Sequence, residues 1–240
     1  ERRATLQLPI TIVTLLISLF AVINIRGREA SDVAGGSVVY DGGAFLIQLF
    51  VLIIAILGTL LIADEKNFTA VASALPGSRE EIEASAAGLR VSEVYPLTLF
   101  AVSGMMLFPV STDLITLFVA LEMLSLPLYL MTGLSRRRRL MSQEAALKYF
   151  LLGAFASAFF LFGAAFLYGS SASITLGGIR QAVVGGTGNN IFLLIGIIFI
   201  SVGLLFKVGA VPFHSWTPDV YQGAPDRKST RLNSSHMSES

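Results

Sequence analysis

The chain has 240 residues, of which 54% are hydrophobic and 14% charged, with a net charge of +1 and no cysteine. A soluble domain carries about 25% charged residues, and the mean hydropathy of +0.73 also favours a membrane protein. The near-neutral charge leaves no basic excess for binding nucleic acid. The lack of cysteine excludes disulfides, thiolate metal sites and iron–sulfur ligation by this chain.

Six apolar segments fit a helix that crosses about 30 Å of hydrocarbon, which takes about 20 residues. They are Leu6–Ile25, Ala44–Ala63, Val94–Val110, Leu114–Leu134, Ala145–Tyr168 and Ile191–Val211. A shorter and less apolar stretch, Pro212–Gly223, follows them. Nothing supplies a polar outer face for six such runs, which disfavours the core of a large soluble protein. The sequence therefore predicts an all-α, polytopic transmembrane helical bundle.

The connections between these segments are informative. Residues 110–113 make a tight link, so the third and fourth helices should form an antiparallel hairpin, with Thr112 or Asp113 as the N-cap of the fourth. Residues 64–93 form a longer polar loop, and residues 169–190 are rich in Gly and Ser, with one weak helical patch.

Both ends of the chain differ from this pattern. The first residue is Glu1, so we expect the native chain to start earlier, and the first apolar run lacks the cleavage site of a signal peptide. Residues 226–240 (DRKSTRLNSSHMSES) are polar and unpatterned, and we expect them to be a non-native tail.

Two ionisable residues lie deep in apolar runs, Glu122 and Lys207. Charges inside membrane spans are costly and are functional candidates. In hydrocarbon a lone carboxylate is driven protonated and a lone lysine neutral, and each regains its charge when the other comes close. Such a site can take up and release a proton. The alternative is a static ion pair that locks two helices together.

A proline follows each of these charges, Pro127 after Glu122 and Pro212 after Lys207. Each proline removes the backbone hydrogen bond to the carbonyl four residues earlier. Interrupted helices with a charge at the break recur in ion transporters. We therefore expect an interruption beside each charge, the alternative being a simple packing kink.

Three further residues are candidates of lower rank. His214 could relay protons, because an ordinary histidine titrates near pH 6.5, or could bond to a helix end. Lys148 lies four residues after Glu144, a spacing that suits a surface ion pair as well as a proton-path residue. Asp219 is interpreted as an interfacial cap. The sequence contains no phosphate loop, nucleotide fingerprint or metal-ligand motif.

Three motifs, in this order, resemble the subunit N family of NADH-quinone oxidoreductase (respiratory complex I), the homologue of mitochondrial subunit 2. They are EMLSLPLY (Glu122–Tyr129), EAALKYFLLGAFAS (Glu144–Ser157), and Phe206-Lys207 with VPFHSWTPDVYQGAP (Val211–Pro225). The similarity covers nearly all of Leu6–Pro225. The string WTPDVYQGAP is specific, since the sister antiporter-like subunits L and M usually read WLPDA there.

The resemblance implies that residues 1–225 are the first part of the antiporter-like, proton-conducting fold, with an interrupted helix, in a bacterial inner (plasma) membrane. Such a subunit holds no cofactor and moves protons across the bilayer, while other subunits carry FMN, iron–sulfur clusters and quinone and pass electrons from NADH. Its expected partners are the other membrane-arm subunits. Glu122 and Lys207 match the family's proton-path pair.

This sequence departs from the family pattern in length. The family has an additional first helix, a further lysine-bearing helix and a second, inverted set of helices. We therefore expect that this part alone does not pump. Two other interpretations stay open: a stand-alone sodium/proton antiporter subunit of the same superfamily, which would use the same Glu and Lys, and a non-catalytic structural membrane subunit.

Charge predicts the orientation of the chain. The cluster Arg136–Arg139 should be cytoplasmic, because basic loops stay inside. A reporter fused at Arg138 should then be cytoplasmic and one fused near Gly178 external, as scored by an enzyme reporter active on one side only. Finding both reporters on one side would remove the six-span topology.

Overall fold

The computed structural model describes residues 2–25, 32–63, 79, 93–134, 139–186 and 188–223 of the chain. Its helices are α1 (Arg2–Ile25), α2 (Gly42–Ile62), α4 (Val94–Leu107), α5 (Leu114–Thr132), α6 (Arg139–Ser171), α7 (Leu176–Val184), α8 (Asn190–Val208) and α9 (Trp216–Gly223). Two short antiparallel strands, β1 (Asp32–Val33) and β2 (Val38–Val39), flank the 3-10 turn η1 (Ala34–Gly36). The predicted all-α membrane architecture is confirmed.

Five helical segments in these ranges are long and apolar enough to cross a membrane. They are Leu6–Ile25, Gly42–Ile62, Leu114–Thr132, Ser142–Ser171 and Asn190–Val208. The sixth predicted span, Val94–Val110, is shorter, because α4 ends at Leu107 and continues only as the 3-10 turn η2 (Phe108–Val110). Pro109 lies in this turn and has no N–H to extend the α-helical ladder.

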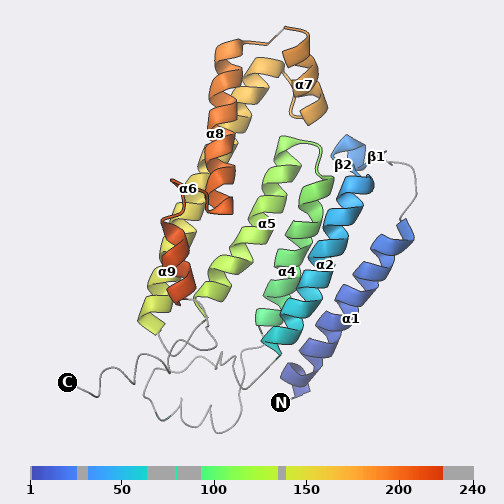
Figure 1. Cartoon of the computed structure of the whole chain (residues 1–240), viewed down its shortest axis with the longest axis vertical. Coiled ribbons are helices and arrows are strands. Elements are labelled where there is room, and N and C mark those ends of the chain that lie inside the picture. The colour runs from blue at the N-terminus through green and yellow to red at the C-terminus, as the bar shows by residue number, and fades with distance from the viewer. Residues whose placement is uncertain are drawn as a thin grey trace, which may run out of the picture.

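The helices pack in succession, with α1 against α2, α2 against α4, and α4 against α5 (Figure 1). Helix α6 joins this layer to the rest, since it packs against α5 on one side and against α8 and α9 on the other. The small β-hairpin and α7 lie at one end of the bundle, and the start of α6 and α9 lie toward the other. The chain thus alternates between the two ends, as the sequence predicts, although Arg136–Arg138 fall outside the described residues.

Glycines allow two of the helix pairs to approach closely. A Cβ on Gly104 of α4 would lie 2.4 Å from the backbone nitrogen of Leu124 in α5. A Cβ on Gly163 of α6 would lie 2.7 Å from the carbonyl oxygen of Gly196 in α8. Such small residues bring membrane helices together, because lipid gives no hydrophobic drive for association. Stacked rings extend the α6–α8 contact, with centroids 5.4 Å apart for Phe159 and Phe199.

The outer faces of the bundle are apolar. Large hydrophobic side chains are exposed along the helices, among them Ile17, Phe20, Phe50, Ile54, Phe155 and Ile191. Buried positions include polar residues such as Gln48, whose side chain donates to the carbonyl of Met106 at 2.8 Å. An apolar surface around a partly polar interior is the arrangement of a protein surrounded by lipid.

The turn between α4 and α5 connects three parts of the chain. Asp113 is the N-cap of α5 and accepts from the backbone nitrogens of Ile115 and Thr116 at 2.9 and 2.8 Å. The residues on either side of Asp113 also form backbone hydrogen bonds. Thr112 donates to the carbonyl of Ser37, and Leu114 donates to the carbonyl of Ile174. The predicted cap and hairpin are therefore confirmed, and the turn also fastens the β-hairpin and the segment before α7.

Several predicted boundaries are wrong. Helix α6 begins at Arg139 and ends at Ser171, outside the predicted limits Ala145–Tyr168 on both sides. The helical patch predicted in the glycine-rich loop is confirmed as α7, which is longer than predicted and begins after the Thr175 cap. Helix α8 ends at Val208 rather than Val211, because Gly209 takes a left-handed conformation. Most of the predicted loop 64–93 and the whole predicted tail 226–240 lie outside the described residues.

The Asp113 cap can be tested by substitution. Asp113→Ala should lower the free energy of unfolding of the full-length subunit by about 1–2 kcal/mol, because two backbone N–H groups lose their acceptor. Asp113→Asn keeps an acceptor oxygen and should cost less. Denaturant titration in detergent micelles measures both, and equal stability of Asp113→Ala and the parent would contradict the capping role.

The same cap predicts a pH dependence. Burial raises the pKa of Asp113, but the hydrogen bonds from Thr116, Ser37 and Ile115 outweigh burial and hold it below its ordinary value. A lowered folded-state pKa stabilises the fold fully above the unfolded pKa of about 3.9, and this contribution is lost as the pH falls through the folded value. The stability difference between parent and Asp113→Asn should therefore shrink below about pH 4.

Candidate functional site

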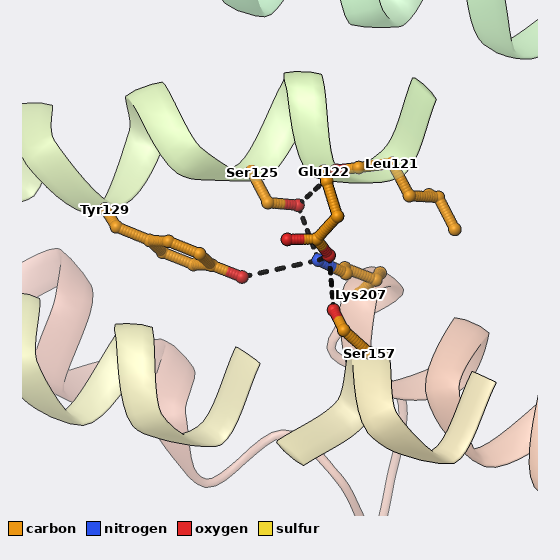
Figure 2. Close-up of polar contacts among 6 residues, drawn as sticks. All are labelled: Leu121, Glu122, Ser125, Tyr129, Ser157 and Lys207. Atoms are coloured by element: carbon orange, nitrogen blue, oxygen red, sulfur yellow. Dashed lines mark hydrogen bonds and ion pairs between the residues drawn. The ribbon is translucent and has the colours of Figure 1, made fainter. Parts of the chain in front are cut away.

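Three helices bring five polar side chains together (Figure 2). Helix α5 contributes Glu122, Ser125 and Tyr129, which lie three and seven residues apart and so share one face of the helix. Helix α6 contributes Ser157 and helix α8 contributes Lys207, near its C-terminal end. The two charges picked out from the sequence therefore belong to one site.

Lys207 Nζ lies close to three oxygen atoms. Its Nζ lies 2.5 Å from Ser125 Oγ, 3.3 Å from Tyr129 Oη and 3.5 Å from Glu122 Oε1. A charged lysine has three N–H donors and no acceptor, so the site matches the ammonium form. The side chains of Lys207 and Glu122 are only 14% and 23% exposed, so little water is available to replace these partners.

Glu122 has a second donor, which comes from α6. The hydroxyl of Ser157 donates to Glu122 Oε1, the same oxygen that faces Lys207. One carboxylate oxygen therefore contacts both an ammonium group from α8 and a hydroxyl group from α6.

Two features terminate α8 next to Lys207: a Schellman motif and a hydrogen bond from Trp216. Gly209 has φ 68° and ψ 31°, its N–H donates to the carbonyl of Phe206, and Ala210 donates to the carbonyl of Leu205, which together make a Schellman motif. Trp216 Nε1, at the start of α9, donates to the same Phe206 carbonyl at 3.1 Å. The predicted interruption after Lys207 is therefore present, and it lies between α8 and α9.

The predicted interruption at Pro127 is wrong. Helix α5 runs from Leu114 to Thr132 with Pro127 inside it. A proline removes only one backbone hydrogen bond, and the flanking bonds and packed neighbours hold a membrane helix together at such a point. The Glu122 carboxylate thus projects from a continuous helix.

The other candidates lie apart from this group of contacts. Lys148 Nζ is 2.8 Å from Glu144 Oε1 and 3.0 Å from Asp219 Oδ2, and its side chain is about half exposed. Asp219, interpreted from the sequence as a cap, lies in the first turn of α9 and pairs with Lys148. His214 is exposed in the turn before α9, and its main-chain carbonyl accepts from Thr217.

Ser125, Tyr129 and Ser157 belong to the site but were not predicted from the sequence. The spacing of Ser125 and Tyr129 from Glu122 places them on its helix face and could have identified them. Nothing in the sequence pairs Ser157 with Glu122, because that contact depends on how α6 packs against α5. Within the described ranges, no group of three His, Cys, Asp or Glu side chains could hold a metal ion.

A family model described as "NADH:quinone oxidoreductase/Mrp antiporter, TM" matches residues 111–239, which is more than half of the chain and includes the whole site. The chain belongs to this family. It is accordingly a multi-pass protein of the bacterial inner (plasma) membrane.

The chain is also similar to individual members of this family. The chain is 59% identical over 204 residues to NADH-quinone oxidoreductase subunit N of Nocardioides sp., an alignment that covers 82% of this chain and 38% of the relative. A chain of respiratory complex I from Thermus thermophilus is 35% identical, with a TM-score of 0.69 over 92% of this chain and 43% of that one. The sequence thus spans well under half the length of these relatives.

A more distant structure shares only the fold. A chain of the Mrp complex from Dietzia sp. superposes with a TM-score of 0.69 over 92% of this chain and 40% of that one, at 18% identity. The fold alone therefore does not distinguish a complex I subunit from an antiporter subunit.

The Trp216 contact can be tested by hydrogen exchange. The Trp216 ring stacks on Tyr149, with ring centroids 4.6 Å apart. Trp216→Phe keeps an aromatic ring at this position but removes the N–H that donates to the Phe206 carbonyl. Amide exchange at Gly209 and Ala210 in the full-length subunit should become roughly 3- to 10-fold faster, as expected for one lost hydrogen bond. The matched control Tyr149→Phe keeps this bond, and equal exchange in both variants would refute the role of the indole N–H.

Proposed function

We propose that this chain is part of a membrane-arm subunit of the proton-pumping NADH:quinone oxidoreductase and that the Glu122–Lys207 pair lies on its proton path. The observation that carries the proposal is the ammonium–carboxylate pair, 3.5 Å apart and mostly buried among membrane-spanning helices. Electrons would pass from NADH to quinone through FMN and iron–sulfur clusters in other subunits, and this chain would move protons.

The chemistry of the pair suits proton transfer. Moving one proton from Lys207 Nζ to Glu122 Oε1 breaks an N–H bond, forms an O–H bond and converts two charges into two neutral groups. In a low-dielectric site the charged and neutral forms of such a pair are close in free energy, because desolvation opposes the charges and their attraction offsets it. A change in the distance between the two groups then changes which form is favoured.

Lys148 and Asp219 are the second part of the proposal. Their contact joins the start of α6 to α9, which directly follows the interruption after Lys207. We place Lys148 on the proton path between the buried pair and the aqueous side. His214, which is exposed in the turn before α9, is a further candidate for this path. Lys148 can form these surface ion pairs and also lie on the proton path.

Similarity favours this proposal over the antiporter rival. The relative named NADH-quinone oxidoreductase subunit N is 59% identical, whereas the Mrp complex chain is 18% identical, although both likenesses cover most of this chain. A purely structural role is the weaker rival, since replacing a buried ion pair by packed apolar residues is often neutral or stabilising.

The test substitutes the pair in the full-length subunit of the assembled complex. Lys207→Ala and Glu122→Ala should each strongly reduce proton uptake per NADH oxidised in reconstituted vesicles, and Glu122→Asp should be milder. The double change should cost less than the sum of the single changes, because the two residues act together.

The controls separate transport from assembly. Removing one partner of a buried pair costs up to about 3–5 kcal/mol, so subunit content must be measured in every variant. Lys207→Arg keeps the charge and shows whether a positive group alone is enough. Pumping at the parent ratio and rate by Lys207→Ala would reject the transport role in favour of a static ion pair.

A further inference from the structure

The hydrogen atoms of the site are not equally free to move. The hydroxyl of Ser125 donates to the carbonyl of Leu121 at 2.6 Å, and the hydroxyl of Ser157 donates to Glu122. Each serine has a single O–H, so neither can donate to Lys207 without giving up the hydrogen bond that it makes now. In this arrangement Ser125 accepts from Lys207.

The Tyr129 hydroxyl is in a different position. It accepts from Lys207 Nζ at 3.3 Å. Among the hydroxyl groups in Figure 2, Tyr129 alone can redirect its hydrogen without giving up a backbone carbonyl or the carboxylate.

The ring of Tyr129 is held so that only this hydrogen needs to move. The side chain is 5% exposed, and its ring packs edge-on against Tyr149 and Phe150 with centroids 4.5 and 5.8 Å away. A Cβ at Gly153 of α6 would lie 2.0 Å from Tyr129 Oη, so the hydroxyl occupies the space that the missing side chain leaves. The oxygen is thus fixed beside Lys207 while its O–H bond can rotate.

We propose that Tyr129 is a positioning residue whose hydroxyl accepts a hydrogen bond from Lys207 in its charged form and donates one in its neutral form. The inference rests on the proposed proton transfer by Lys207. When a proton passes from Lys207 Nζ to Glu122 Oε1, the neutral amine gains a lone pair. Rotation of the Tyr129 O–H toward Nζ pairs that lone pair, and Tyr129 keeps its own proton throughout. The amine therefore stays in place for reprotonation.

Tyr129→Phe in the full-length subunit of the assembled complex tests this role. Phenylalanine keeps the ring, its packing and its contact with Lys207, whose Nζ lies 5.8 Å from the ring centroid, and removes only the hydroxyl. Quinone-linked NADH oxidation and proton uptake should slow by roughly 3- to 10-fold, the effect of losing one hydrogen bond. The solvent isotope effect in D₂O should rise, because proton transfer becomes slower relative to the other steps.

Two further variants make the result specific. Tyr149→Phe removes a hydroxyl from the adjacent ring, which does not contact Lys207, and should leave the rate and isotope effect unchanged. Gly153→Ala displaces the Tyr129 hydroxyl without removing it and should reproduce the effect of Tyr129→Phe, which also decides the matter if Tyr129→Phe fails to assemble.

The outcomes separate this inference from the proposed function. A parent-like rate and isotope effect in Tyr129→Phe, with pumping abolished in Lys207→Ala, overturns the role of Tyr129 and keeps the proton-path assignment. Equal slowing by Tyr149→Phe also overturns it, since aromatic packing would then explain both variants. Normal pumping by Lys207→Ala rejects the proposed function itself, whatever Tyr129→Phe does.

Discussion

The cost of holding an ammonium group inside an apolar bundle governs the arrangement of the site. An isolated charge in low dielectric is strongly disfavoured, and it persists only where oxygen atoms replace its water. Lys207 meets this condition through a carboxylate and two hydroxyl groups, all three from α5. The position of α8 relative to α5 is therefore fixed by charge at this depth as well as by packing.

Helix α5 positions three of the five side chains of the site. Its start is set by the Asp113 cap, and its inner face carries Glu122, Ser125 and Tyr129 in fixed register. Because α5 continues through Pro127, these three side chains keep constant spacing, and the interruption lies only on the lysine side, after Val208. The carboxylate thus projects from a continuous helix and faces a lysine that lies next to a helix end.

Much of this could be predicted from the sequence, for identifiable reasons. Apolar length located the spans, and a short polar link with Asp113 located the cap, because both signals are local. The two buried charges were evident from their surroundings, and the structure brings them together. The effect of Pro127 and the end of α8 at Gly209 were not predictable, since neighbouring helices and backbone conformation decide them. The Ser157 contact likewise depends on tertiary packing.

Glycines form a seam of close contact between α6 and α8, and this seam has a consequence for how the protein tolerates mutation. Gly163, Gly196 and Gly203 contain no ionisable group, yet a Cβ at any of them would meet the facing helix at less than 3.0 Å. Substitution there would push the backbones apart and carry Lys207 with α8. A displacement of about 1 Å can cost about a hundredfold where reacting groups must be aligned. Loss-of-function changes should therefore occur along this apolar seam, one or more helical turns away from any charge.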